Sequence, residues 1–283
     1  MIGIYVFSAT GNTFKCASYI KEVLLSEGRE VELKRIENGS ETIDKHYDTL
    51  IICYPIHGFN MPTNVYSFCK NLKYGKGTNV YFVESSGEPL EVNHASSKKA
   101  EKALTKNGFN CLGDYHYIMP YNMIFKHTNE MASKMWDAAQ RRIRVDALNM
   151  IEAKPHHLKK SVWTKFVCFV VRIEQWGMRF SGRFFHVRKK RCIKCMACVR
   201  NCPMKNITYD ERKDKFKFGG KCLGCQRCAF QCPKDAIFFG LMDWMSVNGQ
   251  YNFNADKDKA VIGKYCHKAY VKYFKETDEQ YPN

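Results

Sequence analysis

Long hydrophobic runs are missing from this 283-residue chain. Its longest purely apolar stretch is Phe166–Val171, far short of the about 20 residues that a transmembrane helix needs. No apolar segment of the secretory type opens the chain. We therefore expect a cytoplasmic protein without a transmembrane segment.

Two glycine-rich nucleotide loops are absent as well. The chain has neither the G-x4-G-K-[ST] pattern of a Walker loop nor the G-x-G-x-x-G pattern of a dinucleotide loop. No nucleic-acid-binding motif accompanies the formal net charge of +17. These absences argue against a P-loop NTPase, a dinucleotide-binding Rossmann enzyme and a nucleic-acid-binding protein.

Acidic residues are scarce in one segment only. Residues 1–152 hold 18 Lys and Arg against 17 Asp and Glu, whereas residues 153–191 hold 11 against 1. Residues 192–283 hold 16 against 10. The basic excess is therefore local, and complementary charge suits a redox protein partner with an acidic surface.

Cysteine, by contrast, is abundant, and eight of the 14 cysteines form one pattern twice. Each run has the spacing C-x2-C-x2-C-x3-C-P, and the second lies 30 residues after the first. The first run is Cys192, Cys195, Cys198, Cys202 and Pro203, and the second is Cys222, Cys225, Cys228, Cys232 and Pro233. This is the bacterial iron–sulfur run, in which the fourth Cys binds the other cluster.

Loop geometry supports that crossing, because one tight loop supplies three converging thiolates but cannot wrap the far side of a cluster. We assign one [4Fe-4S] cluster to Cys192, Cys195, Cys198 and Cys232, and the other to Cys222, Cys225, Cys228 and Cys202. Zinc ribbons and disulfides are the alternatives. Two complete runs in register favour iron–sulfur, and they closely resemble the two-[4Fe-4S] bacterial ferredoxins over about residues 188–240.

Alternating strand and helix patterns fill the first 153 residues. Strands are predicted over 1–7, 30–36, 49–54, 79–85 and 111–119. Helices are predicted from Phe14 to Gly28, from Pro62 as a first helical residue, from an Asn93 cap to Asn107-Gly108, and over 129–153. This alternation predicts an α/β fold, a doubly wound parallel sheet covered on both faces.

The loop after the first strand is dense in hydroxyl groups. Ser8-Ala9-Thr10-Gly11-Asn12-Thr13 offers side chains and backbone N–H groups at a helix N-terminus, which is an anion site. It resembles the T/S-x-T-G-x-T phosphate loop of flavodoxins. The resemblance implies a five-stranded sheet in the order 2-1-3-4-5 and an FMN whose phosphate contacts Ser8, Thr10, Gly11, Asn12 and Thr13.

The same resemblance implies that two further loops flank the flavin ring. They contain Tyr54, Pro55, His57 and Gly58, and then Ser85, Ser86, Gly87 and Glu88. Unlike most flavodoxins, this chain has no aromatic residue between Ser85 and Leu90. One face of the flavin ring would then be open to a small substrate, and the candidate catalytic residues are Tyr121, Asn122 and His57.

Together the two halves resemble the flavodoxin–ferredoxin fusion family sometimes called EFR-type ferrodoxins, over about residues 1–240. The resemblance implies an electron-transfer flavo-iron–sulfur protein with FMN and two [4Fe-4S] clusters. The alternative is a flavin-dependent reductase of a small molecule, and a third reading has the clusters as folding staples in a regulatory protein. The expected domains are 1–153, a connector at 154–187, a small α+β ferredoxin-like domain at 188–240, and an extension at 241–283.

The connector leaves three readings open. Its apolar residues at helical spacing and its many Lys and Arg residues fit a helix packed between the two halves. They also fit a helix on a membrane surface through 159–191, or a docking face for an acidic redox partner. Residues 260–274 are predicted to form one more helix, within an extension that packs on the rest.

Overall fold

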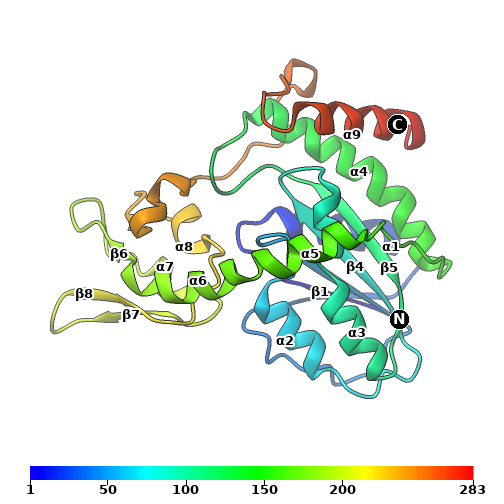
Figure 1. The fold of residues 1–283 in the computed structure, drawn as a ribbon, viewed down its shortest axis with the longest axis horizontal. Coiled ribbons are helices and arrows are strands. Elements are labelled where there is room, and N and C mark those ends of the chain that lie inside the picture. The colour runs from blue at the N-terminus through cyan, green and yellow to red at the C-terminus, as the bar shows by residue number, and fades with distance from the viewer. Residues whose placement is uncertain (283) are drawn as a thin grey trace.

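A five-stranded parallel sheet forms the centre of the first half of the chain in the computed structural model, which describes residues 1–282 (Figure 1). Its strands are β1 (Ile2–Val6), β2 (Val31–Arg35), β3 (Thr49–Pro55), β4 (Asn79–Ser86) and β5 (Asn110–Ile118). They lie in the order β2-β1-β3-β4-β5, and every neighbouring pair is parallel. The predicted fold class and strand order are confirmed.

Helices cover both faces of this sheet, as a doubly wound fold requires. On one face, α1 (Asn12–Ser26) and α4 (Asn129–Ile151) contribute Ile20 and Ile143 to a core with Val6. On the other face, α2 (Thr63–Asn71) and α3 (Lys98–Lys106) contribute Phe68 and Leu104 to a core with Phe82. Both hydrophobic layers hold the carboxyl ends of the strands in fixed register.

Three predicted helix starts are wrong, each for a local reason. Pro62 has an extended ψ of 143° and precedes α2 instead of opening it. The side chain of Asn93 bonds the carbonyl of Glu88, so a short 3-10 helix, η1 (Glu91–Ala95), precedes α3. The last helix, α9 (His267–Gln280), begins later than predicted because Cys266 has a positive φ of 50°.

The basic connector forms two helices that run end to end. They are α5 (Val162–Val171) and α6 (Ile173–Ser181), followed by the 3-10 turn η2 (Gly182–Phe184). Thr164 and Cys168 are buried on the inner side of α5, which contacts η1. The connector therefore crosses the first half of the chain and leads into the second (Figure 1).

The cysteine-rich part repeats one small unit twice. Its strands are β6 (His186–Val187), β7 (Ile207–Asp210), β8 (Lys215–Phe218) and β9 (Ile237–Phe238), which pair β6 with β9 and β7 with β8, both antiparallel. Its helices are α7 (Ala197–Arg200) and α8 (Arg227–Phe230). Positive φ angles recur with the 30-residue offset of the sequence, at Lys194, Met196 and Lys205 and again at Gly224, Gln226 and Asp235.

The C-terminal residues pack on the first half. After η3 (Gly240–Met245) and η4 (Lys257–Lys259), α9 places Tyr270, Tyr273 and Phe274 against Met131 and Met135 of α4. No helix in residues 1–282 is long and apolar enough to cross a membrane.

Candidate functional site

A cleft of about 350 Å³ opens at the carboxyl ends of β1, β3, β4 and β5. Ligands of open α/β sheets bind at this edge, where the strand order reverses. Of the residues predicted to hold a cofactor or a substrate, the cleft is lined by Thr10, Asn12, Thr13, Pro55, His57, Gly58, Ser85, Ser86, Gly87, Glu88, Tyr121 and Asn122.

The hydroxyl-rich loop between β1 and α1 is built to receive an anion. Gly11 precedes α1 with a φ of 111°, and no side chain caps the N–H groups at that helix end. Ser8 accepts a hydrogen bond from the Gly11 N–H at 3.2 Å and so closes the loop. Free N–H groups and the positive end of the helix dipole together favour a phosphate group here.

Neighbouring loops hold this first loop in place. The Thr13 and Ser85 hydroxyls lie 2.7 Å apart, and the Asn12 amide donates to the Pro120 carbonyl at 2.7 Å. Asn122 also donates to the Thr10 hydroxyl. The segment after β5 is therefore a fixed wall of the cleft.

Two titratable groups in the cleft have shifted pKa values. Burial raises the pKa of Glu88 to about 7, although Asn93 lowers it by hydrogen bonding, and Tyr121 donates a hydrogen bond to this carboxyl. Burial lowers the pKa of His57 to about 4. At neutral pH the His57 ring is therefore uncharged, whereas the Glu88 carboxyl titrates within the physiological pH range.

Three of the predicted residues lie elsewhere. Tyr54 is fully buried in the core, where its hydroxyl bonds Glu84 and Ser96, so it does not flank a ring in the cleft as predicted. Ser8 and Gly11 line an adjacent hollow beside Arg227. A strand-end tyrosine gives no sequence signal that separates core packing from ring stacking.

The eight cysteines of the repeat fall into two groups of four. Burial raises the pKa of Cys198 to about 11, and the nearby thiols of Cys192, Cys195 and Cys232 raise it further. Burial likewise raises the pKa of Cys222 to about 12, with additional contributions from Cys225 and Cys202. Burial raises the pKa of Cys228, and the thiols of Cys225, Cys222 and Cys202 raise it further. Cys228 and Cys198 of the other group line one small hollow and pack on the same apolar cluster.

Backbone N–H groups bond sulfur at equivalent places in both runs. Cys192 and Cys222 accept from the residue two positions on, at 3.3 and 3.4 Å. Cys202 and Cys232 accept from the residue four positions on, at 3.3 and 3.2 Å. Such bonds stabilise thiolates and tune a bound cluster.

The second cysteine run forms part of the cleft itself. Leu223, Gly224, Cys225 and Gln226 line it together with the hydroxyl-rich loop. Beside them, the buried Arg227 guanidinium donates to the Ser8 and Ala9 carbonyls at 2.8 and 3.2 Å and pairs with Glu37 at 2.5 Å. One arginine thus clamps a cysteine loop onto the anion loop.

Two family models match the chain in the same order as these two sites. A flavodoxin domain matches residues 3–117, and a 4Fe-4S dicluster domain matches residues 191–236. The chain therefore contains a region similar to flavodoxin domains, followed by a region similar to 4Fe-4S dicluster domains. The flavodoxin domain implies FMN, and the dicluster domain implies iron–sulfur clusters. Both cofactors carry electrons, which indicates a role in electron transport.

Curated relatives match only a short part of the chain. Archaeal glutamate synthase [NADPH] from Archaeoglobus fulgidus is 45% identical over 51 residues, which are 18% of this chain and 10% of that protein. NAD(P)H-quinone oxidoreductase subunit I from Gloeobacter violaceus is 30% identical over 88 residues, 28% of this chain and 42% of that protein. The chain thus spans from a tenth to less than half of these relatives.

Solved flavodoxin structures align with about half of the chain. Oxidised flavodoxin 2 from Bacillus cereus is 19% identical, covering 53% of this chain and 97% of its own, with a TM-score of 0.39. A flavodoxin from Streptococcus pneumoniae is 16% identical, covering 53% of this chain and 96% of its own, with a TM-score of 0.37.

The residues of the flavodoxin domain fit an FMN. The uncapped start of α1 suits the phosphate, and the cleft has the size of a small-molecule site. Within residues 1–282, the buried Gln226 side-chain oxygen has no hydrogen-bond partner and lies at the cleft, so a bound molecule with a hydrogen-bond donor would satisfy it.

The dicluster domain also fits its cofactor. A cubane takes one thiolate at each of four irons, and each group of four thiols described above would supply such a set. No cysteine forms a disulfide anywhere in residues 1–282. Across the same residues, no three His, Cys, Asp or Glu side chains are arranged around a single metal ion.

Several residues that line the cleft were not predicted from the sequence. They are Glu174, Gln175 and Met178 of α6, Leu223 and Gln226 within the second cysteine run, Met245 at the end of η3, and Tyr265 before α9. All come from segments remote from the flavodoxin loops in sequence. Although the loop after β4 has no aromatic residue, Tyr265 brings an aromatic ring to the cleft wall, 5.9 Å from that of Tyr121.

Proposed function

We propose that this protein passes electrons between one FMN and two [4Fe-4S] clusters, and from there to or from a partner redox protein. The observation that carries the proposal is that Cys225 and its loop line the flavin cleft. When bound, FMN exchanges one or two electrons, whereas each cluster exchanges one.

The two cysteine groups have different surroundings, which suggests an order for them. The group of Cys222, Cys225, Cys228 and Cys202 lies beside the cleft, and Cys228 lines one small hollow with Cys198 of the other group. In that other group Cys195 is exposed to solvent. The protein therefore offers a continuous path from the flavin cleft to an exposed thiol, where a partner protein can dock.

A reducing compartment suits this chemistry. The six cysteines outside the repeat are also free, and burial raises the pKa of Cys16 to about 12, so this thiol stays protonated and unreactive. We place the protein in the cytoplasm on this ground.

Cofactor content tests the proposal first. Protein purified without oxygen should contain about eight irons per chain, as two four-iron clusters require, and one extractable FMN. Two irons or zinc without flavin would refute it.

The crossed ligand assignment makes a sharper prediction. Cys232→Ala should damage the exposed cluster held by Cys192, Cys195 and Cys198, and Cys202→Ala should damage the cluster at the cleft. In both variants about half of the iron should be lost while FMN stays bound. Cys266→Ala, outside both runs, is the matched control and should keep all the iron. Loss of the cluster held by the same run as the substituted cysteine would contradict the assignment.

A second candidate function is a flavin-dependent reductase of a small molecule. The cleft itself favours this function, because it is lined by Tyr121, Asn122 and His57. The loops predicted to hold FMN line the same cleft. Steady-state turnover of a small acceptor by the reduced protein, lowered at least tenfold by Asn122→Ala, would support it. Flavin reoxidation by protein partners alone would leave electron transfer as the function.

A further inference from the structure

The connector carries a long apolar face that no other segment of residues 1–282 covers. Arg172 between α5 and α6 keeps helical backbone angles, and η2 extends the run to Phe184. The run from Val162 to Phe184 spans about 34 Å at about 1.5 Å per residue. Its exposed large apolar side chains are Val162, Trp163, Phe166, Phe169, Val170, Ile173, Trp176, Phe180 and Phe184.

These side chains form one stripe along the helices. They follow each other mostly in steps of three and four residues, which places them on one side of a helix. Exposure is high along the stripe, at 67% for Trp163, 75% for Ile173 and 69% for Trp176. A contiguous apolar surface of this kind marks an interaction site.

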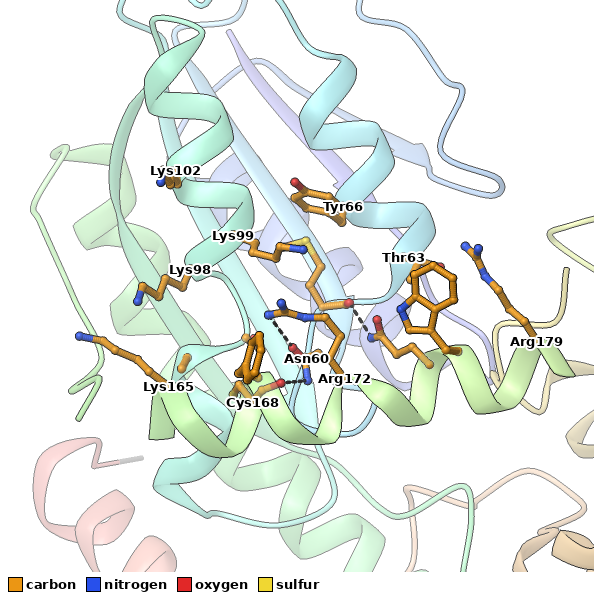
Figure 2. Close-up of a pocket in the computed structure, with 16 residues that line it drawn as sticks. Asn60, Thr63, Tyr66, Lys98, Lys99, Lys102, Lys165, Cys168, Arg172 and Arg179 are labelled. Atoms are coloured by element: carbon orange, nitrogen blue, oxygen red, sulfur yellow. Dashed lines mark hydrogen bonds between the residues drawn. The ribbon is translucent and has the colours of Figure 1, made fainter. Parts of the chain in front are cut away.

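A basic pocket lies along one edge of the stripe. It has a volume of about 380 Å³ and opens between the connector and the helices α2 and α3 (Figure 2). Its cations are Lys98, Lys99, Lys102, Lys165, Arg172 and Arg179. No carboxylate lines it, and none of the six cations forms an ion pair within residues 1–282.

The stripe and the pocket are parts of one surface. Phe169 and Trp176 belong to both, and the Arg172 and Arg179 guanidinium groups lie 6.0 and 5.7 Å from the centres of those two rings. Lys165, Arg172 and Arg179 follow each other at intervals of seven residues, so they form a basic row beside the aromatic stripe. An apolar face thus adjoins a cluster of uncompensated positive charge.

We propose that this surface docks on an anionic membrane, with the stripe in the headgroup boundary and the basic pocket around lipid phosphates. Aromatic and aliphatic side chains beside Lys and Arg are the pattern of helices that lie in a membrane interface. Anionic lipids supply the negative charge that the six cations lack. A second copy of this chain would bring two basic rows together, and a free nucleotide would leave the stripe exposed.

Docking would fix the position of the flavin cleft as well. The inner side of the connector bonds the loop that follows β3, because the Cys168 thiol donates to the Phe59 carbonyl at 2.9 Å. Asn60 donates to the Cys168 carbonyl at 2.9 Å (Figure 2). Gln175 donates to the Met61 carbonyl at 3.0 Å. The same loop places His57 and Gly58 in the cleft. A membrane-bound connector would therefore fix the distance between the cleft and the lipid surface.

Vesicle sedimentation with the cofactor-loaded protein tests the proposal without any redox readout. The protein should bind phosphatidylcholine vesicles that contain phosphatidylglycerol, and should bind pure phosphatidylcholine vesicles far more weakly. Added salt should weaken binding, since the basic pocket is surface-exposed.

Two pairs of variants separate the stripe from the charge. Trp163→Gln with Ile173→Gln, neither of which lines the pocket, should lower the affinity for anionic vesicles about 100-fold, because two apolar side chains no longer leave water. Lys98→Gln with Lys102→Gln should lower it about 30-fold. Lys264→Gln with Lys268→Gln on the C-terminal segment changes the net charge equally and should leave binding unchanged.

Iron and FMN content serves as the folding control for each variant. No binding to anionic vesicles, or equal losses for the two lysine pairs, would overturn the proposal. A dimer in solution that Trp163→Gln with Ile173→Gln dissociates would overturn it in favour of self-association. Stabilisation by ATP without vesicle binding would assign the pocket to a soluble nucleotide instead.

Discussion

At the scale of single residues, Glu88 is a cleft group whose protonation depends on the fold. Its carboxyl is buried beside Tyr121, and the fold raises its pKa from 4.5 to about 7. The folded state therefore keeps this proton to higher pH than the unfolded chain does. The resulting stabilisation is complete below the ordinary pKa and is lost as the pH rises through the folded value.

Glu88→Gln removes this dependence on pH. Relative to the unsubstituted protein, the variant should gain up to about 3 kcal/mol in unfolding free energy between pH 4.5 and pH 8. Urea denaturation of flavin-free protein at several pH values measures the difference. Glu91→Gln, at an exposed position nearby, is the control, and a parallel pH profile for both variants would disprove the buried-proton account.

At the scale of elements, the start of the connector is anchored by a buried charge. Lys160 pairs with Asp114 of β5 at 2.7 Å and with Glu101 of α3 at 3.1 Å. Asp114 also raises the pKa of the neighbouring Glu84, although burial is the larger cause. Removing Lys160 would thus leave the buried carboxyl groups of Asp114 and Glu84 without a nearby cation.

Lys160→Met should therefore destabilise the protein by about 3–5 kcal/mol, as expected when one partner of a buried pair is removed. Lys159→Met, one residue earlier and exposed, should change stability by less than about 0.5 kcal/mol. Anaerobic urea denaturation measures both. Equal effects of the two substitutions would show that the Lys160 ion pairs carry no stability.

Elements with a strong local pattern were predictable from the sequence, and tertiary placements were not. The strand and helix periods of residues 1–153 and the two cysteine runs are local signals, and both led to the observed sheet and repeat. The prediction of a helix from Asn93 is wrong because a side-chain bond to the Glu88 carbonyl outweighs helix propensity there. Tyr54 was misplaced because burial depends on which neighbours the fold brings to it.

At the scale of the whole molecule, contacts between segments far apart in sequence make the site. Arg227 joins the second cysteine run to the loop after β1, and Tyr265 reaches the cleft from the C-terminal segment. Arg227 occupies a variable position of the second cysteine run and Tyr265 belongs to no motif, so only the folded chain shows what they contact. The protein is arranged as a flavin cleft, a cysteine group at its wall, and a second group with an exposed thiol.

Stopped-flow absorbance with a limiting amount of a reduced electron-donor protein tests that arrangement most directly. The iron–sulfur absorbance should change first, and the flavin should then be reduced at a rate that does not depend on protein concentration, because the transfer takes place within one chain. A flavin reduction rate proportional to protein concentration, or a flavin that never reduces, would contradict the account.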